Sequence, residues 1–139
     1  MGAFLRWQYI NPTSGVNFKN LLHGHSHLMF SGWVLNVLFF SFIDAHIEQR
    51  NKIFNWLLIS LQVCTTGMLI AFPIQGYGLT SIIFSTLHAL ISISIIIFFF
   101  QQTKSSHSIS LWFAKLSMIF FLISTIWALF AWIPFVTWD

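Results

Sequence analysis

Four apolar stretches of membrane-spanning length most restrict the folds that are open to this chain. They cover about residues 20–43, 53–74, 79–100 and 109–136. About 20 apolar residues in a helix cross the roughly 30 Å hydrocarbon layer of a bilayer. Only 6% of the residues are charged, whereas soluble domains have about 25%. The pattern predicts an all-α integral membrane protein, a four-helix bundle in the lipid bilayer.

The first 19 residues are too few and too polar to span a membrane, although their aromatic side chains suit the membrane interface. They lack an apolar core of signal-peptide length and a small-residue cleavage site. We therefore expect an interfacial N-terminal arm (1–19) followed by a four-span domain (20–136). The single cysteine, Cys64, lies in the second apolar stretch and is expected to be a small core residue.

The six basic residues are distributed unevenly along the chain, and acids are scarce. Four basic residues lie in or beside the loops after the first and third spans, and two precede the first span: Arg50, Lys52, Lys104 and Lys115 against Arg6 and Lys19. The positive-inside rule then predicts that both termini face outward, in a bacterial inner membrane. Without a lysine- or arginine-rich run to follow a phosphate backbone, nucleic acid is not an expected partner.

Three histidines occupy alternate positions at the start of the first span, in LLHGHSHLMFSGW (21–33). Ionisable side chains inside membrane spans usually pair with one another, relay protons or hold a metal. On a helix, His23 and His27 share one face, whereas His25 points to the other side. One metal ion would not easily bind all three, and we expect at least one of them to be a ligand or a relay group.

The face of His25 continues through Met29, Gly32 and Asn36 as a stripe of small and polar residues. Gly32 removes a side chain one or two turns below the imidazole, which would make room for a flat cofactor. A glycine there equally allows another helix to approach closely. The sequence leaves both readings open.

The segment HSHLMF (25–30) resembles the H-x-x-x-M segment of the haem-copper oxidase catalytic subunit, in which the histidine is an axial ligand of the low-spin haem. The longer string HSHLMFSGW is similar to H-A-H-x-x-x-x-G-W segments of smaller related membrane proteins. The resemblance covers about residues 17–40. It implies that His25 binds haem b, with Met29 and Gly32 beside it, and that His27 matches the second histidine of the shorter relatives.

The chain has no counterpart of the copper-binding histidine cluster of that family. The resemblance therefore implies electron transfer or redox sensing, and not oxygen reduction. The expected partners are a second copy of the chain or another membrane redox subunit.

His88 lies within STLHALIS (85–92), in the middle of the third span. Because the first and third spans run in the same direction, the depths of His25 and His88 are compatible. A haem held by two imidazoles needs histidines from different helices, and this pairing leaves His23 and His27 free. The alternative for His88 is a structural histidine held by a serine or threonine hydroxyl.

Two other functions remain open at this stage. The first is a non-enzymatic metal-handling or respiratory-complex assembly protein, in which Cu or Zn would be held by His23, His25 and His27. The second is that the chain is the amino-terminal part of a longer oxidase-like protein. No acid lies within a span to orient a histidine, so no catalytic residue is assigned. His46 and His107 are expected to be solvated loop residues, and Tyr77 an interfacial belt residue.

Overall fold

The computed structural model describes residues 2–13, 15, 17–48, 51–104 and 108–136, with the backbone alone from residue 128 onward. All regular elements in these ranges are helical. They are α1 (Gly2–Ile10), α2 (Phe18–His27), the π-helical segment η1 (Leu28–Val34), α3 (Leu35–His46), α4 (Lys52–Gln75), α5 (Leu79–Gln102) and α6 (Ile109–Val136). The predicted all-α class is confirmed.

Four helices are long and apolar enough to cross a membrane. The first runs without a break from Phe18 to His46 through α2, η1 and α3, and the others are α4, α5 and α6. They extend the apolar stretches read from the sequence by about one turn or less. Large apolar side chains such as Phe30 (73% exposed) and Phe113 (68% exposed) cover their outer faces. This surface suits lipid, and the chain is a multi-pass membrane protein.

Asparagine side chains cap the N-terminal ends of two of the spans. Asn17 Oδ1 accepts hydrogen bonds from the backbone nitrogens of Lys19 (3.0 Å) and Asn20 (3.3 Å) at the start of α2. Asn51 Oδ1 accepts one from Ile53 N (3.3 Å) at the start of α4. These N-caps satisfy donors that the first helical turn leaves without partners.

The turn between α4 and α5 is short (76–78), because α4 continues through Pro73 to Gln75. The turn depends on Gly76, which has a φ of +60° and would place a Cβ 2.6 Å from Asn20 Oδ1. Glycine alone adopts this conformation readily and fits against α2. We call this part of the bundle, where the α4–α5 turn meets the start of α2, the Tyr77 end.

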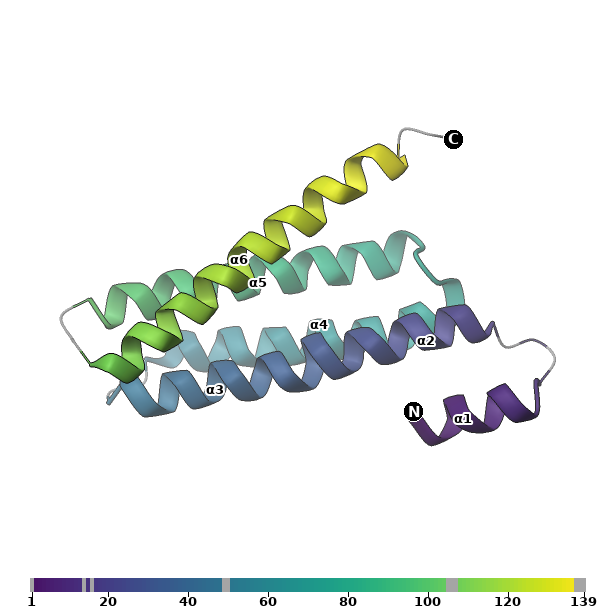
Figure 1. The fold of residues 1–139 in the computed structure, drawn as a ribbon, viewed down its shortest axis with the longest axis horizontal. Helices are drawn as coiled ribbons and strands as arrows, with labels where there is room; N and C mark the ends of the chain where they lie inside the picture. Colours follow the sequence, from purple (N-terminus) through teal and green to yellow (C-terminus); the bar gives the residue numbers. More distant parts are fainter. Residues whose placement is uncertain (1, 14, 16, 49–50, 105–107, 137–139) are drawn as a thin grey trace.

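The hydrophobic core lies toward the opposite end of the bundle. It combines residues from α3, α4, α5 and α6: Leu35, Phe39, Ile43, Phe54, Leu61, Ile95, Ile96, Phe99, Leu111 and Met118. α4 packs extensively against α5 and α2, whereas α6 contacts α5 only lightly and diverges from the other spans toward its C-terminal end (Figure 1). The bundle is therefore closed at the core end and more open at the Tyr77 end.

The N-terminal arm contains a short helix, α1, which packs against α2. Leu5 and Gln8 are buried in this contact, and Tyr9 and Ile10 are exposed. Gln8 also links α1 to the residues that follow it, because its side-chain oxygen accepts a hydrogen bond from Thr13 Oγ1 at 2.8 Å. Its location at a membrane interface stays a prediction.

Candidate functional site

His23 and His27 point toward the α4–α5 turn. The ring of His27 stacks on Phe72, with centroids 4.4 Å apart and an interplanar angle of 12°. His23 meets Tyr77 edge to face at 5.0 Å, and the Tyr77 hydroxyl lies 3.5 Å from His23 Nδ1. The predicted common face of this i, i+4 pair is confirmed, and its neighbours are aromatic.

His25 lies on the other side of α2, against the N-terminal arm. A Cβ built on Gly2 would be 3.7 Å from His25 Cε1. The Nδ1 atom of His25 is buried, and within the described ranges it has no hydrogen-bond partner. Buried polar atoms nearly always have a partner, so an unpaired imidazole nitrogen is an unusual feature that needs an explanation.

His88 is buried in the middle of α5 and bonds to the first span. Its Nε2 lies 3.2 Å from the backbone carbonyl oxygen of Ser31 in η1. A carbonyl oxygen can only accept, so Nε2 carries the proton and Nδ1 of the neutral ring keeps its lone pair. The structural alternative for His88 in the sequence analysis named a serine or threonine hydroxyl as its partner, whereas the observed partner is a main-chain oxygen.

The π-helical segment supplies this oxygen. A π-helix bonds each N–H to the carbonyl five residues earlier, which changes the set of carbonyls left for side chains, and such segments are frequent at functional sites. The side-chain amide of Asn36 donates to the carbonyl oxygens of Ser31 (3.2 Å) and Gly32. Ser31 O therefore accepts from both His88 and Asn36, and ties the first span to α5.

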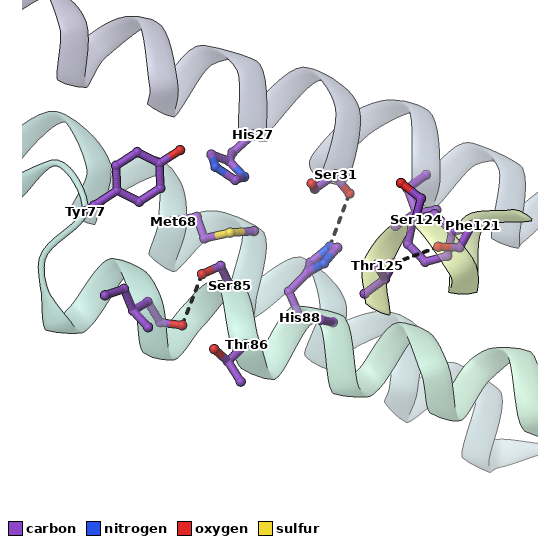
Figure 2. A pocket seen from close by; sticks show the side chains of 13 residues that line it. His27, Ser31, Met68, Tyr77, Ser85, Thr86, His88, Phe121, Ser124 and Thr125 are labelled. Atoms are coloured by element: carbon purple, nitrogen blue, oxygen red, sulfur yellow. Dashed lines mark hydrogen bonds between the residues drawn. The ribbon is translucent and has the colours of Figure 1, made fainter. Parts of the chain in front are cut away.

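A cavity of about 380 Å³ lies between the first span (α2, η1 and the start of α3), α4, α5 and α6. Figure 2 shows His27 directed from α2 toward Met68, and His88 directed from α5 toward Ser31. The lining residues are His27, Ser31, Leu35, Met68, Tyr77, Ile82, Ser85, Thr86, His88, Ala89, Phe121, Ser124 and Thr125. The wall is mostly apolar, with polar groups at a few separate points.

The structure does not bring all the predicted ligands together. His27 and His88 line the same cavity, and His25 is not among its lining residues. Among the residues with described positions, no group of three or more His, Cys, Asp or Glu side chains is arranged to hold a metal ion. The proposed pairing of His25 with His88 and the proposed metal site at His23, His25 and His27 stay predictions.

The stripe predicted to run below His25 is divided between two environments. Met29 is 44% exposed, whereas Gly32 and Asn36 are buried. A Cβ on Gly32 would lie 2.5 Å from Thr65 Cγ2 of α4, which favours the helix-packing role of this glycine. The stripe is therefore not a single open surface for a cofactor.

The remaining sequence expectations concern isolated residues. Cys64 is buried and free, as expected. His46 was expected to be a solvated loop residue, but it is the last residue of α3 at the core end and is half-buried, with its ring centroid 6.2 Å from that of Phe99. His107 lies outside the described residues.

Sequence reasoning missed Tyr77 and Met68 as members of the site. Tyr77 was assigned to the interfacial belt, yet it contacts both His23 and His27. One signal was present, since the turn after the second span is on the same side of the membrane as the start of the first. Met68 lines the same cavity as His27. The sequence of α4 is apolar on most of its faces, so it does not indicate which face of the helix turns toward this cavity.

Comparison with known proteins identified no matching family model, no matching curated protein and no matching solved structure.

Proposed function

We propose that this chain is a haem-binding membrane protein that transfers electrons or senses redox state, with His25 as an axial ligand. The observation that carries the proposal is the buried Nδ1 of His25, which has no partner in the described part of the chain. Leaving a buried polar group unpaired costs about 1–3 kcal/mol. Coordination of iron by the imidazole would relieve this cost, and histidine is a common axial ligand of haem.

The side chains around His25 are compatible with one axial ligand from this chain. Gly2 contributes no side chain over the imidazole, and Met29, which is 44% exposed, follows one turn later. The one carboxylate within the four membrane-spanning helices, Asp44, lies near the opposite end of the first span from His25. The donor set is therefore neutral, and suits a haem better than a hard cation such as Mg²⁺.

The second axial ligand comes from outside the four spans in this proposal. His88 was the first candidate, but its Nε2 donates to Ser31 O in a cavity that His25 does not line. A histidine of a second copy or of another membrane redox subunit would meet the face of α2 that carries His25. A haem bound there would supply a one-electron couple, which is the chemistry that electron transfer or redox sensing needs.

Absorption spectroscopy of the purified protein tests this proposal. A Soret band with resolved α and β bands on reduction is expected, and His25→Ala should lose more than about 90% of the bound haem, because the ligand bond is removed. His46→Ala is the matched control, since it removes a histidine at the other end of the same span.

Two results would contradict the proposal. One is full haem content in His25→Ala. The other is protein without haem that binds Cu or Zn and loses it in His23→Ala and His27→Ala, which would establish the metal-handling alternative.

A further inference from the structure

One side of the cavity beside His27 and His88 is formed by α6, the most loosely packed of the four spans. Phe121, Ser124 and Thr125 of α6 form one wall. α6 contacts α5 only lightly, and it diverges from α2 and α5 toward the Tyr77 end (Figure 1). The neighbouring α6 side chains Ile123 and Trp127 are exposed, so this wall belongs to a helix that borders the lipid. A ligand of this cavity would therefore enter from the bilayer.

The lining provides hydrogen-bonding groups at separated points of an apolar wall. His27 has no hydrogen bond within the described chain, and its ring is fixed by the stack on Phe72. His88 keeps a lone pair on Nδ1, because Nε2 donates to Ser31 O. Leu35, Met68, Ile82 and Phe121 fill the space between these polar groups.

Ser124 lies on the α6 side, across from the histidines, and no hydrogen bond of its hydroxyl occurs among the described residues. Ser85 and Thr125, in contrast, donate to main-chain carbonyls of their own helices. The cavity thus has a donor or acceptor on α2, on α5 and on α6. An occupant with polar atoms on opposite edges would bond to more than one helix.

The volume of about 380 Å³ lies within the range of about 300–1,000 Å³ typical of sites for small organic ligands, and exceeds that needed by a metal ion. We propose that this cavity binds the head group of a lipid-soluble quinone, a flat ring with oxygens on opposite edges and an apolar tail. The tail would leave between α6 and α2 into the lipid. This site is separate from His25 and does not depend on haem.

Equilibrium binding of a benzoquinone with a ten-carbon tail to the purified protein in nanodiscs tests the site. His27→Phe preserves the aromatic stack on Phe72 and removes both ring nitrogens. We expect it to raise Kd by about tenfold, the effect of one good hydrogen bond. Ala89→Leu adds volume inside the cavity and should abolish binding by exclusion.

The matched control is Asn55→Leu, which changes the wall of a second hollow between α3 and α4. It should leave Kd unchanged. His25→Ala should also bind the quinone normally, and this separates the present inference from the haem proposal. Unfolding midpoints close to that of the unchanged protein would show that each variant is folded.

Three outcomes would overturn the inference. The first is that the quinone partitions into protein-containing nanodiscs no better than into empty ones. The second is that Asn55→Leu weakens binding as much as His27→Phe does. The third is that the cavity holds only a phospholipid acyl chain. The last result would be detected as co-purified phospholipid that a saturating concentration of the quinone does not displace.

Discussion

Two histidines in the same membrane bundle use their ring nitrogens in different ways. His88 donates from Nε2 to a carbonyl of another span, while Nδ1 of His25 is buried and unpaired within the described ranges. A buried imidazole with a carbonyl partner fixes its tautomer and its orientation. At the scale of single residues, His88 is therefore a structural link with one lone pair left, and His25 is an imidazole with one buried, unpaired nitrogen.

Removal of the His88 link should have a small effect on stability. We expect His88→Leu to lower the free energy of unfolding by about 0.6–1.7 kcal/mol, the usual value of one hydrogen bond between membrane helices. The loss is limited because Ser31 O also accepts from Asn36. Unfolding of the purified protein in mixed detergent, followed by circular dichroism, measures the change. An effect above about 3 kcal/mol would show that His88 holds more than this one contact.

At the scale of elements, the π-helical segment η1 determines which residues face α4 and α5. A regular α-helix would keep His25, Met29, Gly32 and Asn36 on one face, as the sequence reading assumed. The wider turns from Leu28 to Val34 rotate the later residues relative to the earlier ones. Met29 thus remains exposed while Gly32 and Asn36 are buried.

The contact between Gly32 and Thr65 tests the packing role of the glycine. Gly32→Ala places a Cβ 2.5 Å from Thr65 Cγ2, so the first span must move away from α4. We expect a loss of about 1–3 kcal/mol, as for other overpacked sites. Thr65→Ser removes the obstructing methyl group and keeps the hydroxyl bond to Leu61 O.

The double variant Gly32→Ala with Thr65→Ser should regain most of the lost stability, which a thermal unfolding series can measure. If Gly32 instead provided space for a cofactor, the single variant would lose the cofactor, and the serine would restore neither stability nor binding. The comparison therefore separates the two roles that the sequence left open.

The four spans and their limits were predictable from sequence because the bilayer imposes a minimum apolar length. The opposite orientation of His25 relative to His23 and His27 was also predictable, because it depends only on helical periodicity before the π segment. The pairing of His88 with Ser31 was not, since it involves a main-chain oxygen and a local change of helical register. Tyr77 was missed because its role depends on how Gly76 folds the turn onto α2.

At the scale of the whole molecule, apolar packing and the candidate sites occupy opposite ends of the bundle. The core residues of α3, α4, α5 and α6 hold one end together, and His23, His27, Tyr77 and the cavity lie toward the other, where α6 diverges (Figure 1). The closed end can stabilise the bundle without filling the space near His27 and His88. His25 lies at the Tyr77 end. The orientation of the bundle in the membrane therefore determines from which side a partner protein would reach His25.

The distribution of basic residues predicts this orientation. Lys52, Lys104 and Lys115 lie at the core end, and Arg50 directly precedes α4 in the sequence, so that end should face the cytoplasm and the Tyr77 end should face outward. In a Cys64→Ala background, which removes the only native thiol, Thr13→Cys should react with a membrane-impermeant maleimide added to intact cells, and Ser108→Cys should react only after lysis. Both positions are exposed in the fold, so a difference between them reports sidedness and not burial. The reverse pattern would place His25 near the cytoplasmic surface, and any redox partner of that face would then have to approach from inside the cell.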